Sequence, residues 1–174
     1  ALNTAQEKSI REQIVFYKRH RELFQYGRFY CLAAPEADHG GSWMVVSKDR
    51  RRAAVLEMTG LLQPNASMPP LRLAGLEETY CYQVSLRQQS VELDSFRTLL
   101  NHVLPLKLKA DGMLVHLAGE LYQMPCEQIT FTASGDLLMH AGLRPPQRFC
   151  GTGYTDGVRP MPDFSARIWL LESN

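Results

Sequence analysis

The pattern of hydrophobic and polar positions along the chain changes at Gly27. Before Gly27, hydrophobic residues recur every three or four positions, which is typical of an amphipathic helix. Thr4 followed by Glu7 forms a capping box, whose side chains can bond the free backbone N–H groups at a helix start. Gly27 is the kind of residue that ends a helix in the left-handed conformation. The pattern therefore predicts one long helix over residues 4–26.

The hydrophobic stripe on this helix needs a partner that removes it from water. Ile10, Ile14 and Tyr17 lie near one face at helical spacing, and Phe24 continues that face. The stripe is widened by Val15, Phe16 and Leu23. From the residues alone, the sheet that the rest of this chain is expected to form is one possible partner.

After Gly27, short hydrophobic runs are separated by turn residues, which is the pattern of strands. The expected strands cover residues 28–34, 42–47, 53–58, 80–86, 112–117, 120–124, 129–133 and 166–171. Residues 91–103 are compatible with either a helix or a loop. Many short strands after a single helix favour a mainly β fold: an antiparallel β-sandwich, Greek-key-like, preceded by the long N-terminal α-helix.

Composition places the chain among ordinary globular domains, with 174 residues, 45% hydrophobic and 21% charged. The formal net charge of +1 gives no field that would attract nucleic acid or an anionic membrane. We expect neither partner, and no run of residues is long and apolar enough to span a bilayer. The start at Ala1 suggests a segment of a longer protein. Four scattered cysteines indicate a reducing compartment, so we expect a cytoplasmic location.

Candidate chemistry is weak throughout the chain. The glycine-rich segment 151–157 has the spacing GxGxxxG, not that of a dinucleotide fingerprint, and its three glycines favour a turn. The five histidines are single and lack metal-ligand spacing. The carboxylates considered for a glycosidase pair are Asp111, Glu120, Asp136, Asp156 and Asp163. Three of them adjoin glycines in turn-like segments, so structural roles are favoured. No catalytic, cofactor-binding or metal-binding residue is assigned, and no cofactor is expected.

Two further groups of residues are candidates for binding surfaces. Lys48 with Arg50, Arg51 and Arg52 forms a basic run without interleaved aromatic residues, which favours a solvated hairpin turn. Aromatic side chains could stack on sugar rings, and the candidates are Trp43, Tyr80, Tyr82, Tyr122, Tyr154 and Trp169. Both tryptophans lie within hydrophobic strands, where a core position is favoured.

Several segments together resemble the C-terminal region of bacterial α-galactosidases of glycoside hydrolase family 36. The most specific segment is 135–143, Gly-Asp-Leu-Leu-Met-His-Ala-Gly-Leu, and the closing segment 163–171 agrees with it. Residues 10–30 resemble the helix that leaves the catalytic barrel of the family and the strand after it. Leu73-Ala-Gly-Leu76 resembles a turn of the same family. The chain departs from compact members between residues 85 and 128, where it is longer.

The resemblance implies two parts, with residues 1–27 as the last helix of an upstream (β/α)8 barrel and residues 28–174 as the C-terminal β-sandwich domain. It implies that the parent enzyme removes terminal α-galactose from sugars such as melibiose and raffinose, with retention and without a cofactor. The catalytic carboxylates of the family lie in the barrel, so this chain alone is expected to be inactive. Its expected roles are packing on that barrel and assembly of homo-oligomers of the parent. The alternatives are a carbohydrate-binding module that contacts galactosides and a purely structural interaction domain.

Overall fold

The computed structural model describes residues 4–36, 40–60, 69–87, 89–92, 123–126, 129–144 and 164–173. The chain divides into two compact units, one formed by residues 1–19 and 88–126 and the other by residues 20–87 and 127–174. Helix α1 (Thr4–Tyr26) belongs to both, because its last turns lie in the second unit. Its observed bounds are those predicted from the capping box and the hydrophobic spacing.

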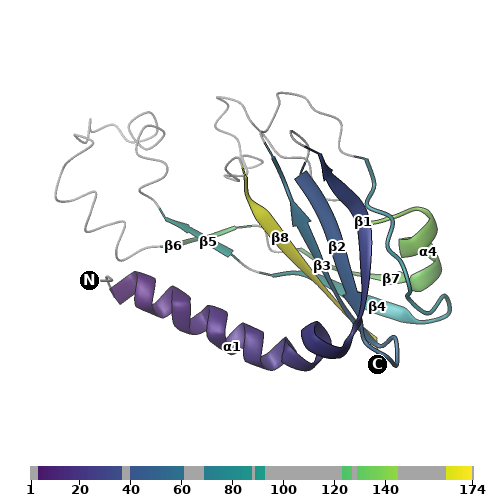
Figure 1. Ribbon diagram of the computed structural model, residues 1–174, viewed down its shortest axis with the longest axis horizontal. Coiled ribbons are helices and arrows are strands. Elements are labelled where there is room, and N and C mark those ends of the chain that lie inside the picture. The colour runs from purple at the N-terminus through teal and green to yellow at the C-terminus, as the bar shows by residue number, and fades with distance from the viewer. Residues whose placement is uncertain are drawn as a thin grey trace. The chain divides into compact units, whose positions relative to one another are not determined.

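The first unit holds the first part of α1 and a small two-stranded sheet (Figure 1). Strands β5 (Gln89–Glu92) and β6 (Gln123–Cys126) pair in antiparallel fashion, with Gln89 opposite Cys126. The strand expected over residues 120–124 overlaps β6. The strand expected over residues 112–117 lies outside the described residues, as does most of segment 91–103.

The second unit is built on a six-stranded sheet with the order β1-β2-β3-β8-β4-β7 (Figure 1). The strands are β1 (Arg28–Glu36), β2 (Gly40–Val46), β3 (Arg52–Met58), β4 (Cys81–Leu86), β7 (Thr130–Ser134) and β8 (Ala166–Glu172). Every neighbouring pair is antiparallel. The mainly β, antiparallel class after one long N-terminal helix is therefore confirmed. The C-terminal strand β8 lies in the middle of the sheet and joins the β1–β3 meander to β4 and β7.

One face of this sheet carries the hydrophobic core. Residues that face each other across antiparallel strands share a face, so Met44, Val55 and Trp169 lie side by side. All three are buried, and so are Val84 and Leu171 on the neighbouring positions. The core is closed by residues from outside the sheet, which are Leu73, Leu76, Leu138 and Leu143. Two of these come from the segment before β4, and two come from helix α4 (Gly135–His140) and the residues after it.

The opposite face of the sheet is also hydrophobic, but it is only half-buried. Trp43 lies opposite Leu56, and Leu56 lies opposite Ile168, which makes one continuous row across three strands. Trp169 is completely buried on the core face, as predicted, whereas Trp43 faces the other side and keeps part of its surface in water.

Two expectations are corrected by the structure. Gly27 ends α1, but it does not adopt the left-handed conformation, which among the described glycines is found at Gly40, Gly75 and Gly142. A glycine is needed at position 27 because Leu23, Val45 and Val46 leave no room for a Cβ atom. The second correction is α4, a helix that the sequence analysis did not predict within segment 135–143. It spans six residues, which is too short for a helical hydrophobic period to be visible.

Candidate interaction site

The turn between β2 and β3, residues 47–51, joins distant parts of the second unit. The backbone closes it through two hydrogen bonds, from the Ser47 N–H to the Arg52 carbonyl (2.8 Å) and from the Arg50 N–H to the Ser47 carbonyl (2.9 Å). Arg50 adopts a left-handed conformation with φ of 57°. That conformation is uncommon for a residue with a Cβ atom, so the turn depends on further contacts to hold it.

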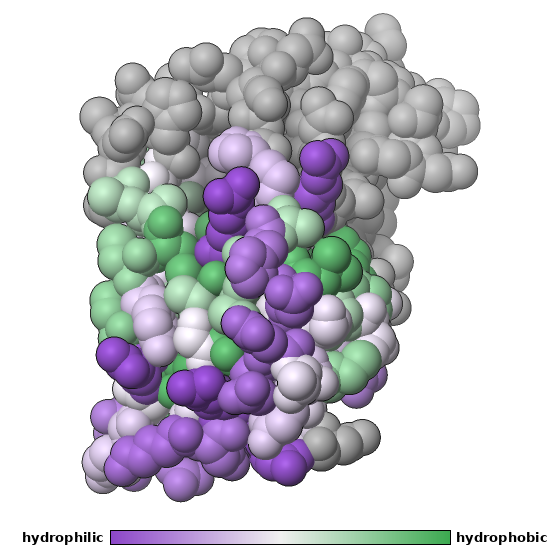
Figure 2. All heavy atoms as spheres, turned by 90° about the vertical axis from the view of Figure 1, so that its right-hand side faces the viewer, coloured by the Kyte–Doolittle hydropathy of each residue, from purple (hydrophilic) through white to green (hydrophobic). Residues whose placement is uncertain are grey.

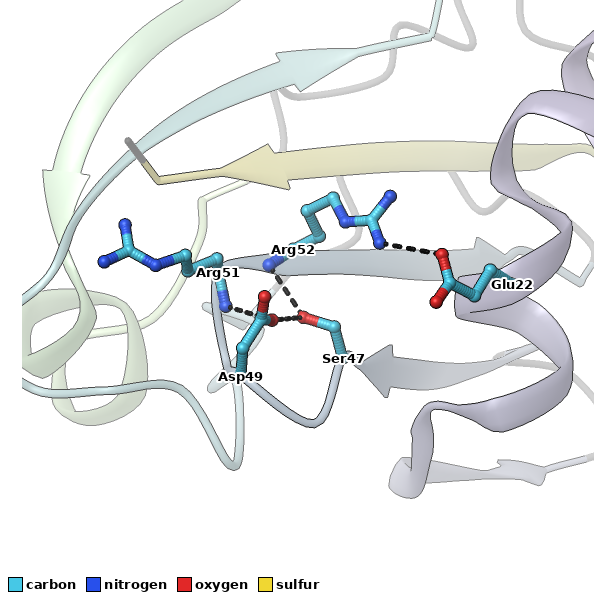
Figure 3. Close-up of polar contacts among 5 residues, drawn as sticks. All are labelled: Glu22, Ser47, Asp49, Arg51 and Arg52. Carbon is cyan, nitrogen blue, oxygen red and sulfur yellow. Dashed lines mark hydrogen bonds and ion pairs between the residues drawn. The ribbon is translucent and has the colours of Figure 1, made fainter.

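A side-chain network at the base of the turn supplies part of that support (Figure 3). The Ser47 hydroxyl donates to Oδ1 of Asp49 at 2.6 Å, and the Arg51 N–H donates to the same oxygen at 3.1 Å. The Arg52 N–H donates to the Ser47 hydroxyl at 2.9 Å. The hydrogen bond from Ser47, followed by that from the Arg51 backbone, lowers the pKa of Asp49 below its ordinary value of 3.8. The folded turn therefore favours the ionised form of the Asp49 carboxylate.

The three arginines of the basic run point to three different neighbours. Arg50 forms an ion pair with Glu77 at 2.9 Å. The Arg52 guanidinium reaches Glu22 of α1 at 3.3 Å (Figure 3). The guanidinium of Arg51 lies 5.0 Å from the ring centroid of Tyr80, within cation–π range. Exposed ion pairs contribute little free energy each. The run is a hairpin turn, as predicted, but its three arginine side chains contact other parts of the protein instead of being only solvated.

Tyr82 fixes the same turn from the inside of the domain. Its completely buried side chain donates a hydrogen bond to the Arg50 carbonyl (2.6 Å) and accepts one from the Glu77 N–H (3.0 Å). Burial raises the pKa of this phenol above its ordinary value of 10.0. Tyr82 was considered as a platform for sugar rings, and its burial removes it from that role.

A second polar group lies on the core face of the sheet, near the far ends of β2 and β3. Ser42, Glu57 and Arg167 are cross-strand neighbours, and all three are buried. An Arg167 guanidinium nitrogen lies 3.9 Å from a Glu57 carboxylate oxygen, and the Trp169 indole N–H points to the same oxygen at 3.5 Å. When two opposite charges are buried next to each other, their mutual attraction offsets part of the free energy that is lost when both leave water. We assign this group to the core.

Of the carboxylates considered for glycosidase chemistry, Asp136 alone lies in the part of the chain that the structure describes. It occupies the first turn of α4, is largely exposed and approaches Nδ1 of His140 to 3.0 Å through Oδ1. Asp111, Glu120, Asp156 and Asp163 lie outside the described residues, as does segment 151–157. The geometry of Asp136 is that of a residue one helical turn from a basic partner.

Helix α4 packs closely against the loop before β4 through its first residue, Gly135. Ser134 caps the helix by accepting a hydrogen bond from the Leu137 N–H at 3.2 Å. A Cβ atom on Gly135 would lie 2.1 Å from the Glu77 carbonyl oxygen, so only glycine fits at this contact.

Among the described residues no group of three metal-ligating side chains is found, and no helix is long and apolar enough to cross a membrane.

Of the two helices that the structure describes, α1 carries the larger group of exposed hydrophobic side chains, and most of these lie in its first part. Ile10, Ile14 and Tyr17 are 45%, 47% and 46% exposed, and Val15 is 66% exposed. Leu23, in the part of α1 that belongs to the second unit, is buried at 3% exposure. We call Ile10, Ile14, Val15 and Tyr17 the α1 stripe.

On the side of the molecule shown in Figure 2, hydrophilic side chains cover most of the lower surface and hydrophobic ones lie in patches beside them.

The partners of the basic run and the role of Tyr82 could not be predicted from the sequence. Glu22, Glu77 and Tyr80 come from other segments of the chain, and nothing in the local spacing pointed to them. A signal was present only for Asp49, because Ser47 and Asp49 two residues apart favour a local hydrogen bond in a turn.

The chain matches a known protein family. Residues 41–171 match the model of the glycosyl hydrolase family 36 C-terminal domain. The chain is 36% identical over 83 residues to alpha-galactosidase AgaA of Geobacillus stearothermophilus and 34% identical over 84 residues to alpha-galactosidase 1 of Pediococcus pentosaceus. These matches cover 48% and 47% of this chain and 11% of each relative.

The fold agrees with solved structures over almost its whole length. The crystal structure of the GH36 alpha-galactosidase AgaB from Geobacillus stearothermophilus superposes with a TM-score of 0.63 and 25% identity. The superposition covers 99% of this chain and 16% of that one. The alpha-galactosidase from Lactobacillus brevis shares the fold at a TM-score of 0.63 and 22% identity. The chain thus spans a small fraction of the length of the relatives it matches.

Proposed function

Because the chain belongs to the glycosyl hydrolase family 36 C-terminal domains, as its sequence resemblance predicted, we propose that it is a non-catalytic domain of a longer α-galactosidase. The observation that carries the proposal is the family match over residues 41–171. The relatives that match are named as alpha-galactosidases, and each is much longer than the matched region. The chemistry of the parent would then reside outside this chain.

The proposed parent hydrolyses terminal α-galactosides such as melibiose and raffinose with retention of configuration. Retaining glycosidases hold two carboxyl groups about 5 Å apart, one as nucleophile and one as acid. Asp136 is instead exposed and paired with His140, which supports a structural role for it. In this proposal no residue of the chain contacts the reacting sugar, and the domain needs no cofactor.

The proposed partner is the catalytic (β/α)8 barrel of the same protein, contacted through the α1 stripe. Exposed side chains of Ile10 and Ile14 on one helix face cost free energy in water, about 25 cal/mol for each Å². Docking on a larger body would remove that cost. Accordingly, we propose residues 1–27 as the last helix of the barrel and residues 28–174 as the C-terminal domain. We also propose a contribution to homo-oligomers of the parent.

The proposal includes a bacterial and cytoplasmic setting. Cys31 and Cys81 are both free and exposed on the sheet, which suits a reducing compartment. The matched relatives come from bacteria, including Geobacillus stearothermophilus.

The test is to express the longer gene product that contains this sequence and to follow hydrolysis of raffinose and melibiose by NMR. The expected result is release of galactose whose first-formed anomer is α. If the longer protein were inactive on α-galactosides but active on another glycoside, the family assignment would stand and the proposed substrate would be wrong. If the β anomer were released first, the proposed retaining mechanism would be wrong.

A carbohydrate-binding module is the weaker reading. It requires exposed aromatic platforms. Of the six aromatic candidates, Trp169 and Tyr82 are completely buried, Trp43 and Tyr80 are half-buried, and Tyr122 and Tyr154 lie outside the described residues. Titration of the isolated chain with galactose and raffinose tests it directly, and we expect no saturable binding.

A further inference from the structure

A row of polar side chains crosses three strands on the core face of the six-stranded sheet. Ser42 of β2 lies opposite Glu57 of β3, and Glu57 lies opposite Arg167 of β8. Directly opposed residues of antiparallel strands point to the same face, with Cβ atoms about 4.5–5.5 Å apart. The exposed fractions are 3% for Ser42, 7% for Glu57 and 1% for Arg167. The whole row is therefore shielded from bulk water.

The neighbours of this row along the strands differ in character. On one side lie Met44, Val55 and Trp169, which are buried members of the hydrophobic core. On the other side, Thr59 and Ser165 adjoin the ends of β3 and β8. The Thr59 hydroxyl donates to the Ser165 carbonyl at 3.1 Å and lies 3.1 Å from the Ser165 hydroxyl. That pair is therefore bonded within itself and is not a partner of the row.

The polar contacts to the Glu57 carboxylate are long. An Arg167 guanidinium nitrogen lies 3.9 Å from Oε2 of Glu57, and the Trp169 indole nitrogen lies 3.5 Å from the same oxygen. Hydrogen bonds from N–H to oxygen are ordinarily about 2.7–3.2 Å long. Polar groups that face each other over a longer distance are often bridged by a water molecule. A carboxylate accepts up to about four hydrogen bonds, so Glu57 can serve a further donor beside these two contacts.

The Ser42 hydroxyl is the observation that carries the inference. Its oxygen is buried, and it has no hydrogen-bond partner among the described residues. A buried hydroxyl without a hydrogen bond costs free energy, and folded proteins rarely keep such a group. Ser42 shares its face of the sheet with Glu57. A partner that suits both side chains has to be small and has to donate as well as accept hydrogen bonds.

We propose that one internal water molecule binds in this row, bonded to the Ser42 hydroxyl, the Glu57 carboxylate and the Arg167 guanidinium. The charges favour a neutral guest, because Glu57 and Arg167 offset each other and an ion would add an unpaired buried charge. Water both donates and accepts, and internal waters typically make about three hydrogen bonds to buried polar groups. The bound water joins β2 to the β3–β8 pair through side chains. This site lies within the second unit and does not depend on the proposed function.

A high-resolution crystal structure of the 174-residue chain tests the site directly. The expected result is density for one water molecule at about 2.7–3.2 Å from Oγ of Ser42 and from a carboxylate oxygen of Glu57. Density without that water would overturn the proposal. So would a structure in which the Ser42 hydroxyl bonds directly to another group of the protein.

The sign of one substitution gives an independent test. If the water is bound, Ser42→Ala removes a bonded hydroxyl and should lower Tm by about 2–4 °C. If the hydroxyl had no partner, the same change would remove an unsatisfied buried group and raise Tm. A raised or unchanged Tm would therefore overturn the role of Ser42.

Ser85→Ala is the matched control for this substitution. Ser85 is a half-buried serine of β4, which lies inside the same sheet between β8 and β7. Replacing it shows how much of the change in Tm comes from exchanging serine for alanine in a strand. The proposal predicts that Ser42→Ala lowers Tm clearly more than Ser85→Ala. Equal shifts in the two variants would contradict it.

Discussion

The hydroxyl of Tyr82 donates a hydrogen bond of 2.6 Å to the carbonyl oxygen of Arg50, 32 residues earlier in the chain. The same hydroxyl accepts from the Glu77 N–H, and the ring is completely buried. One phenol oxygen therefore satisfies two backbone groups, one in the β2–β3 turn and one in the loop before β4. This contact lies beneath the left-handed residue Arg50, whose conformation needs outside support.

Tyr82→Phe should lower the free energy of unfolding by about 1–3 kcal/mol, because two backbone groups lose their partner without gaining water. Urea denaturation of the isolated chain measures this effect. Tyr80→Phe is the matched control, since Tyr80 is only half-buried, and its change should stay within about 0.5 kcal/mol. Equal effects of the two variants would show that the Tyr82 hydroxyl does not support the turn.

Asp49 should make the stability of the chain depend on pH in the acid range. Its pKa is lowered in the folded state by the Ser47 hydroxyl and the Arg51 N–H. A lowered folded pKa means that its contribution is present above the unfolded pKa and is lost as the pH falls through the folded value. The stability difference between the original chain and Asp49→Asn should therefore be largest near neutral pH and shrink below pH 3.8.

Urea midpoints at several pH values between 2 and 7 measure this difference. In a Ser47→Ala background the pH dependence contributed by Asp49 should be smaller, because its strongest hydrogen bond is gone. A difference that grows as the pH falls would contradict the assigned direction.

Gly135→Ala should destabilise the second unit strongly. The new Cβ would lie 2.1 Å from the backbone oxygen of Glu77, so that α4 or the loop before β4 has to move. Overpacking of this kind typically costs 1–3 kcal/mol. Ser134→Ala, which removes only the helix cap, should cost about 1 kcal/mol. Thermal unfolding of both variants measures these costs. If Gly135→Ala proved the milder change, the close contact between Gly135 and the Glu77 carbonyl would not be important for stability.

The two ends of α1 should respond differently to substitution in the isolated chain. Leu23→Ala removes a buried side chain and should cost about 2–5 kcal/mol. Ile14→Asp changes a side chain that is 47% exposed, and its cost in the chain alone should be far smaller. In the longer protein, Ile14→Asp should become strongly destabilising, because the stripe is then proposed to be covered. Equal tolerance of Ile14→Asp in both contexts, measured by thermal unfolding, would contradict docking through the stripe.

The sequence predicted the regular elements where local chemistry is decisive. The bounds of α1 follow from Thr4, Glu7 and Gly27, although Gly27 acts through close packing and not through a left-handed backbone. The strand at 81–86 has alternating burial, and the turn at 47–51 was recognised from its polar residues. These features depend on neighbours within a few positions, which a single sequence displays.

The order of the strands and the partners of the basic run could not be predicted in this way. Strand β8 lies between β3 and β4, and this pairing joins residues more than 80 positions apart. Arg50, Arg51 and Arg52 contact residues of α1 and of the loop before β4, which lie far from the turn in sequence. Non-local pairing of this kind leaves no periodic trace in the sequence. The same holds for the burial of Arg167 beside Glu57.

Hydrolysis of p-nitrophenyl α-galactoside by the purified 174-residue chain, measured beside the longer gene product, shows whether this domain is catalytic. We predict turnover by the longer protein and none by the chain alone, because the catalytic carboxylates are proposed to lie outside it. Turnover by the chain alone that is abolished by Asp136→Asn or Asp163→Asn would contradict this prediction and would place an active site on this domain.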